Sequence, residues 1–223
     1  MICIIPARKN SKRIKNKNII KFHGKPLISY AIRNAINSKI FSKVIVSTDS
    51  QKIANISKKY GAEVPFLRSK NLSNDETTVT KVLKEILPKF KDLKKNKYFC
   101  CLYPTSPLIK PKDLISAFNK IKKINADALM SITKFNNHPF RSLIIKKNNL
   151  RFLWKKNEKK QSQDLPELYH DAGAFYFYKI NKFLKGTKLL LPKKTLPYYL
   201  EKKNSVDIDD LEDLKLAEKL FKR

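Results

Sequence analysis

The first 130 residues alternate short apolar runs with amphipathic stretches, and this alternation limits the fold more than any other feature. Apolar runs typical of buried strands cover residues 2–5, 43–49, 98–102 and 128–132, and apolar residues at helical spacing cover 27–37, 51–60, 77–87 and 113–123. A further strand at 174–178 and a last helix at 211–221, with Asp210 as its N-cap, continue the pattern. We predict one α/β domain over 1–223, with a mostly parallel sheet and helices on both faces.

The alternation stops between about residues 135 and 171. Two short strands are predicted inside this segment, around 143–145 and 150–153, with Asn148 and Asn149 as a two-residue hairpin turn because asparagine tolerates positive φ. We interpret the segment as a small β excursion from the sheet that takes part in dimer contacts or in the site.

The net charge of +30, from 49 basic and 19 acidic residues, raises the hypothesis of a nucleic-acid-binding module. The lysines, however, spread over every segment instead of gathering on one face or arm, so no specific nucleic-acid partner is expected. Cys3, Cys100 and Cys101 lie in predicted buried strands, which suits a reducing cytoplasm. No apolar run has the length of a signal peptide core or a membrane span, so no membrane association is expected.

Basic and polar residues crowd the loop that follows the first strand. Arg8, Ser11, Lys12, Lys17 and Asn18 follow a buried strand, where the carboxyl edge of a sheet offers a place for polyphosphate. The loop lacks the G-x-x-x-x-G-K-[ST] spacing of a Walker loop, which argues against a GTPase-like ATPase. A solvated basic loop in a lysine-rich protein remains the alternative.

Two carboxylates stand near the end of the chain, in Val206-Asp207-Ile208-Asp209. On an extended segment the side chains of Asp207 and Asp209 face the same way, and hard oxygens in that arrangement suit Mg²⁺ bridging phosphate oxygens. The alternative is structural, because carboxylates are common where a helix begins.

A polar cluster precedes the strand at 174–178. His170 and Asp171 are either a surface ion pair at the entry to that strand or contacts to a hydroxylated, anionic substrate. With three histidines and no helical i,i+4 pair, a zinc site is not supported. A serine hydrolase is not supported either, because the G-x-S-x-G elbow is absent.

Taken together, these segments resemble the cytidylyltransferases that activate nonulosonic acids, the sialic-acid-like sugars. The family opening I-I-P-A-R-x-x-S-K-x-I-x-x-K-N matches Ile4 to Asn18 at every fixed position. Further matches follow in order along nearly the whole chain, at Gly24-Lys25-Pro26, Val46-Ser47-Thr48-Asp49, Tyr60-Gly61-Ala62-Glu63-Val64, Pro104-Thr105-Ser106-Pro107-Leu108 and Asp207-Ile208-Asp209.

The resemblance implies a nucleotide-diphospho-sugar transferase-like fold and a CTP- and Mg²⁺-dependent enzyme that forms a homodimer. It implies catalytic roles for Arg8, Lys12 and Asp209, and a metal site at Asp207 and Asp209. The implied nucleotide contacts are Arg8, Ser11, Lys12, Lys17, Asn18, Arg68 and Thr77, and the implied sugar contacts are Tyr103, Thr105, His170 and Asp171.

Within that family the chain is similar to the pseudaminic acid branch, through Ser162-Gln163-Asp164-Leu165, Tyr169-His170-Asp171-Ala172-Gly173 and Phe175-Tyr176. Three departures bear on this assignment: Lys9-Asn10 stands where many relatives have two glycines, Gln161 where an arginine is usual, and Ala174 where glutamine is frequent. The last two concern the sugar side, so N-acylneuraminate and legionaminate cytidylyltransferases remain alternatives.

Overall fold

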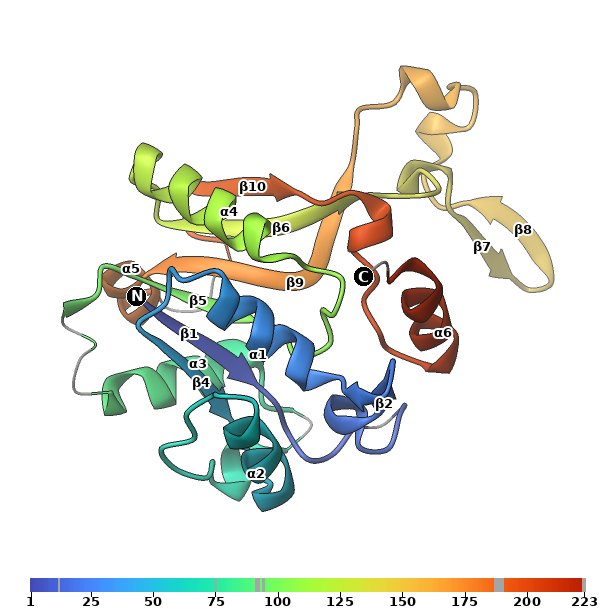
Figure 1. The fold of residues 1–223 in the computed structure, drawn as a ribbon. Helices are drawn as coiled ribbons and strands as arrows, with labels where there is room; N and C mark the ends of the chain where they lie inside the picture. Colours follow the sequence, from blue (N-terminus) through green and yellow to red (C-terminus); the bar gives the residue numbers. More distant parts are fainter. Residues whose placement is uncertain (12, 75, 91–92, 94, 187–190, 222–223) are drawn as a thin grey trace.

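A six-stranded sheet forms the centre of the protein in a computed structural model that describes residues 1–11, 13–74, 76–90, 93, 95–186 and 191–221 (Figure 1). In spatial order its strands are β10 (Thr195–Tyr199), β6 (Ala128–Lys134), β9 (Tyr169–Lys179), β5 (Tyr98–Leu102), β1 (Ile2–Pro6) and β4 (Lys43–Ser47). Strand β9 pairs antiparallel with both of its neighbours, and the remaining pairs are parallel. The predicted mostly parallel sheet is confirmed.

Helices cover both faces of this sheet, as predicted. Their bounds are α1 (Ile28–Asn37), α2 (Gln51–Lys59), α3 (Val79–Ile86), α4 (Pro111–Ile124), α5 (Ile180–Lys185) and α6 (Leu211–Leu220). Successive strand residues point to opposite faces. Cys3 and Cys100 therefore pack in the cluster that includes residues of α1, α2 and α4, whereas Cys101 packs with residues of α3 and α5. The prediction that all three cysteines are buried is confirmed.

The chain returns from the excursion to the sheet slightly earlier than the sequence suggests. Strand β9 already begins at Tyr169, and its first three residues pair with Lys134, Thr133 and Ile132 of β6 beyond a register shift. Strand β9 thus starts two residues before the approximate end predicted near 171, because this irregularity lets the long antiparallel pair continue past the point where the apolar pattern breaks.

Two strands inside the excursion, β7 (Leu143–Lys146) and β8 (Asn149–Phe152), form an antiparallel hairpin that projects away from the sheet (Figure 1). The turn consists of Lys147 and Asn148, with φ of 49° and 60°, and not of Asn148 and Asn149 as predicted. Asn149 pairs with Lys146, so the strand register places a lysine in the left-handed region.

Residues 205–209 pair with no strand of the sheet, and burial alternates along them, with Ile208 buried between the more exposed Asp207 and Asp209. They lead into α6, whose N-cap Asp210 accepts hydrogen bonds from the backbone N–H groups of Glu212 and Asp213, as predicted. Ile208 is fully buried in a third cluster with residues from the small hairpin β2 (Lys21–Phe22) and β3 (Lys25–Pro26), from its flanking loops and from α6. The C-terminal helix is thereby fixed beside the first loop of the chain. Among the residues that the structure describes, no helix is long and apolar enough to cross a membrane.

Candidate active site

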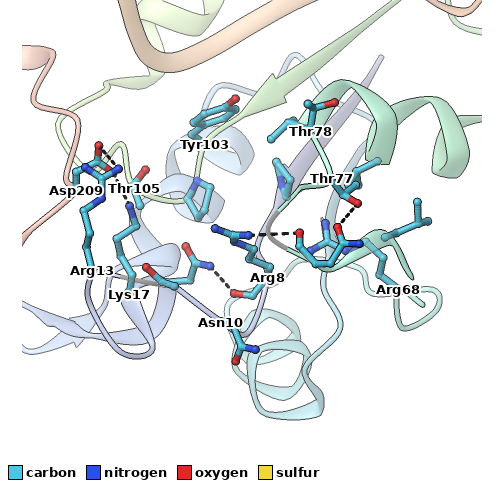
Figure 2. Close-up of a pocket in the computed structure, with 18 residues that line it drawn as sticks. Arg8, Asn10, Arg13, Lys17, Arg68, Thr77, Thr78, Tyr103, Thr105 and Asp209 are labelled. Atoms are coloured by element: carbon cyan, nitrogen blue, oxygen red, sulfur yellow. Dashed lines mark hydrogen bonds and ion pairs between the residues drawn. The ribbon is translucent and has the colours of Figure 1, made fainter. Parts of the chain in front are cut away.

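A cavity of about 430 Å³ opens at the carboxyl ends of β1 and β5 (Figure 2). The crevice outside the carboxyl ends of strands is where open α/β sheets bind their ligands. Of the predicted site residues, the cavity is lined by Arg8, Ser11, Lys17, Asn18, Arg68, Thr77, Tyr103, Thr105 and Asp209. Four segments therefore contribute residues to one cavity: the first loop, the loop at 68–78, the end of β5 and the segment before α6. Lys12 lies outside the described residues.

The first loop is held in place by its own backbone at several points. The N–H of Ala7 donates to the Ser47 carbonyl at 2.9 Å, and the N–H of Lys9 donates to Asp49 Oδ1 at 2.7 Å. Asn18, which is buried, donates from Nδ2 to the Arg8 carbonyl at 2.9 Å. These bonds fix the course of the loop, so the Arg8 side chain enters the cavity from a defined backbone.

At one end of the cavity, Arg13 and Lys17 surround the carboxylate of Asp209 (Figure 2). Lys17 Nζ lies 3.0 Å from Oδ1 and also donates to the Ile208 carbonyl at 2.8 Å, while Arg13 Nη2 lies 2.9 Å from Oδ2. The Asp209 N–H donates to Asp213 of the α6 capping box at 2.9 Å. Asp209 is therefore oriented through both its backbone and its side chain.

Arg68 and Thr77 lie at the opposite end of the cavity (Figure 2). Arg68 is buried; its N–H donates to the Thr48 carbonyl at 2.7 Å and its Nε to Ser73 Oγ at 3.0 Å. Burial lowers the pKa of Arg68, and the nearby Asp49 carboxylate raises it again. A buried guanidinium with remaining donors is suited to a planar polar group that lies against this wall.

The predicted sugar contacts divide into two groups. Tyr103 and Thr105 line the cavity, whereas His170 and Asp171 are exposed residues of β9 outside its wall. His170 packs against Phe135, with ring centroids 4.7 Å apart. Asp171 accepts hydrogen bonds from the Tyr176 hydroxyl at 2.7 Å and from the Gly173 N–H at 2.9 Å. His170 and Asp171 are thus not a mutual ion pair.

Tyr103 connects the cavity to the Asp171 group. Its N–H donates to the Ala174 carbonyl at 2.8 Å, and its ring lies 5.4 Å from that of Tyr176. Burial raises the pKa of the Tyr103 and Tyr176 hydroxyls, to which Asp171 also contributes, so both hydroxyls remain protonated hydrogen-bond donors near neutral pH. Tyr176 was not among the predicted site residues.

Asp207 does not line the cavity but lies against the bend of β9. A Cβ atom added at Gly173, whose φ is +58°, would lie 2.8 Å from Asp207 Oδ2. Burial raises the pKa of the Asp207 carboxyl to about 6; the charge of Asp209 raises it too, and Lys17 lowers it. Asp207 forms no hydrogen bond or ion pair with any other residue that the structure describes.

Asp207, which forms no ion pair in the described part of the chain, and Asp209 together offer the carboxylate oxygens that a hard divalent cation prefers. Across the described ranges, no group of three or more His, Cys, Asp and Glu side chains could hold a metal. Mg²⁺, however, is usually held by one or two carboxylates together with water and substrate phosphates. The donor set at Asp207 and Asp209 is compatible with that mode of binding.

Sequence reasoning underrated one residue of the first loop. Arg13 resembles any other cation in a lysine-rich protein, since its position is variable in the family opening. The structure places it on Asp209 and in the cavity wall. No sequence signal links residues this far apart, so only the tertiary structure identifies Arg13.

Comparison with known proteins identifies the family. The family model described as "Cytidylyltransferase" matches residues 2–222. The chain belongs to the cytidylyltransferase family. Pseudaminic acid cytidylyltransferase from Campylobacter jejuni is 41% identical to it over 99% of this chain and 96% of that protein. N-acylneuraminate cytidylyltransferase from Escherichia coli is 33% identical over 97% of this chain and 51% of that protein.

The fold of this cytidylyltransferase is also that of a solved enzyme complex. The structure of CMP:2-keto-3-deoxy-manno-octonic acid synthetase complexed with CTP matches it with a TM-score of 0.72 at 15% identity, covering 98% of this chain and 97% of that one. At this identity the likeness concerns the fold alone. The resemblance inferred from the sequence motifs is confirmed at the level of family and fold.

The close approach of Gly173 to Asp207 gives a first test. We expect Gly173→Ala to lower the unfolding free energy by more than about 1 kcal/mol, because the new Cβ combines positive-φ strain with a contact to the carboxylate. Gly24→Ala is the matched control, since Gly24 has φ of +76° and nothing within 4 Å of its Cβ position. Urea denaturation measures both variants. Equal losses would contradict the argument from the carboxylate contact.

The raised pKa of Asp207 gives a second test, on stability against pH without divalent cations. The folded state retains the Asp207 proton up to about pH 6, whereas an unfolded carboxyl loses it near its ordinary value of 3.8. The unfolded state thus binds fewer protons between these values, and stability falls as pH rises through them. The carboxyl lies against Gly173, but the residue as a whole is exposed, so solvent screens much of the effect and we expect a small slope. Asp207→Asn should flatten this slope in denaturation curves from pH 4 to 7; an unchanged slope would contradict it.

Proposed function

We propose that this protein transfers CMP from CTP to the 2-hydroxyl of a nonulosonic acid, which gives a CMP-sugar and pyrophosphate. The observation that carries the proposal is that Arg13 and Lys17 of the first loop contact Asp209 of the C-terminal segment in the wall of one cavity. Nucleotidyl transfer needs positive charge at the leaving pyrophosphate and a fixed position for the attacking oxygen. Membership of the cytidylyltransferase family supports the choice of CTP.

The cavity suggests how the substrates would lie. Arg8, Ser11 and Lys12 would hold the triphosphate and stabilise the charge that develops on pyrophosphate, and Lys17 would contact the phosphates from the end of the loop. Asn18 would act mainly through the loop, since its amide is bonded to the Arg8 carbonyl. Arg68 and the loop to Thr77, at the far end of the cavity, would enclose the cytosine.

The sugar acid would enter from the side of Tyr103 and Thr105. These two residues line the cavity between its cationic end and the bend of β9. Asp171 would contribute by orienting the Tyr176 hydroxyl, and His170 would act at the rim of the site. The attacking 2-hydroxyl must lose a proton, and Asp209 is the carboxylate in the cavity wall that would accept it, directly or through water.

Asp207 and Asp209 would hold Mg²⁺, with phosphate oxygens and water as the remaining ligands. When bound, the ion would neutralise phosphate charge and bring the α-phosphorus toward the sugar hydroxyl. Asp207 lies near enough to Asp209 to feel its charge. The protein's own contribution is to hold this acidic pair beside a cationic loop, so that opposite charges on nucleotide and metal are matched.

Pseudaminic acid is the proposed sugar. The Campylobacter jejuni relative that shares 41% identity over 99% of this chain is named for that substrate. N-acylneuraminate and legionaminate are the alternatives, because related enzymes of the family bear those names as well. The three cysteines are buried and free, which suits the cytoplasm as the proposed location. A specific nucleic-acid partner is not proposed.

We also propose a homodimer formed through the β7–β8 hairpin. The hairpin and the turn after it expose a set of large apolar side chains: Leu143, Ile144, Ile145, Leu150, Leu153 and Trp154. An apolar patch of this kind on a projecting arm is typical of an interface. A second copy of the chain is the partner that the family resemblance implies.

The catalytic proposal is tested by incubating the protein with CTP, Mg²⁺ and each nonulosonic acid and following pyrophosphate release. We expect fastest turnover with pseudaminic acid. Asp209→Asn should reduce turnover by roughly two orders of magnitude or more, the scale of an electrostatic transition-state contact. Asp210→Asn is the control, because asparagine is an equally good N-cap for α6. The absence of pyrophosphate with every sugar, for a folded protein, would refute the proposed activity.

The dimer proposal is tested by Ile145→Glu. The Ile145 side chain is 77% exposed, so a charge there should not disturb the folded monomer but should oppose burial against a second copy. We expect analytical ultracentrifugation to show a monomer for this variant and a dimer for the unaltered protein. Leu211→Glu, at a residue 56% exposed on α6, is the matched control and should remain dimeric. Identical sedimentation of all three proteins would reject the hairpin as the interface.

A further inference from the structure

Two basic side chains, Lys17 and Arg13, form ion pairs with the carboxylate of Asp209 in the free protein. Lys17 Nζ lies 3.0 Å from Oδ1, and Arg13 Nη2 lies 2.9 Å from Oδ2, so each carboxylate oxygen faces a positive charge. Asp209 itself is about one-third exposed, at 32%. A divalent cation that approaches Asp209 therefore meets two like charges at short range, which lowers its affinity for this carboxylate.

The two cations are held very differently. The Lys17 side chain is 17% exposed and has a second bond to the Ile208 carbonyl, so it is part of the packed structure. The Arg13 side chain is 64% exposed and forms no second ion pair with a residue in the described part of the chain. An exposed ion pair of this kind contributes little stability and exchanges partners readily.

The alternative partner for Arg13 lies in the same cavity. Arg13 and Arg8 line the same cavity (Figure 2). Ser11 lines it as well, and the triphosphate is proposed to bind there. Guanidinium groups pair well with phosphate oxygens, and a triphosphate carries more charge than one carboxylate. Rotation of Arg13 from Asp209 to phosphate would break no other hydrogen bond or ion pair of this side chain within the described part of the chain.

We infer that Arg13 is a positioning residue that blocks Asp209 from divalent cations in the free protein and leaves it when the nucleotide binds. The triphosphate attracts Arg13, the Asp209 carboxylate becomes available, and nucleotide and metal therefore bind with positive coupling. The proposed metal role of Asp209 is the premise of this inference. The consequence for the reaction is that a complete metal site forms only when the nucleotide is present.

The test is metal affinity without nucleotide, with Mn²⁺ as the probe and electron paramagnetic resonance as the measurement. Arg13→Gln should bind Mn²⁺ about two- to fivefold more tightly than the unaltered protein, the scale of one exposed ion pair. Lys15→Gln is the matched control, because it removes the same charge from the same loop at an exposed residue without a contact to Asp209. It should leave Mn²⁺ affinity within about 1.5-fold.

A second measurement follows CTP binding by calorimetry in the presence of a chelator. Arg13→Gln should weaken CTP binding at least about threefold, since the guanidinium no longer reaches the phosphates, whereas Lys15→Gln should not. Equal effects of both variants on Mn²⁺ would overturn the inference, because only general charge would then be at work. Unchanged Mn²⁺ affinity in Asp209→Asn would overturn it too. If Mn²⁺ and CTP respond as expected but no sugar gives pyrophosphate, the inference stands and the proposed activity fails.

Discussion

Lys17 contacts the Ile208 carbonyl, 191 residues later in the chain, and the Asp209 carboxylate, 192 residues later. The rest of the site depends on these contacts. The first loop carries only positive charge, and the segment before α6 carries mostly negative charge, so neither is a complete site alone. Ile208 is buried against residues in and next to the first loop, so hydrophobic packing holds the C-terminal segment against this loop. The apolar contact supplies the stability, and the ion pair supplies the orientation.

The charges in the site are ordered although the charges of the chain are not. Forty-nine basic residues give a net charge of +30, yet the cavity places Arg8 and Arg68 in its wall and Asp209 at one end. Asp171 and Asp207 extend the acidic side along the bend of β9. Burial is the main cause that raises the pKa of Asp207, and the charge of Asp209 adds to it. The site thus combines a positive wall with an acidic side, the arrangement on which the proposed binding of triphosphate and a cation rests.

Strand β9 has two functions in this arrangement. It is the one antiparallel strand of the sheet, and its apolar residues Phe175 and Phe177 are fully buried. Its first residues, by contrast, are polar, and they bend through Gly173 so that the backbone approaches Asp207. A glycine is required here, since a side chain would both strain the backbone and displace the carboxylate. Sheet and site are therefore built by one continuous element.

Periodicity alone predicted most helices and strands, because alternating or 3.6-residue patterns record which face each element buries. The sequence also identified the family, and several residues that it singled out, among them Arg8, Lys17 and Asp209, line the cavity, although it passed over Arg13. It failed where local preference is overruled by neighbours: strand register, not asparagine content, selected Lys147 for the hairpin turn. It also gave no warning that β9 continues to Tyr169 beyond an irregularity in its pairing.

What the sequence by itself determined is the chemistry: which residue types follow which buried strands, and hence a cytidylyltransferase of α/β fold. Only the tertiary structure decided which of these side chains are in contact. Arg13 and Lys15 are equivalent cations in the sequence, but only Arg13 reaches Asp209. The reason is physical, because charge attraction is set by distances of a few ångströms, and packing around Ile208 fixes those distances. A linear pattern carries no such distances between residues so far apart.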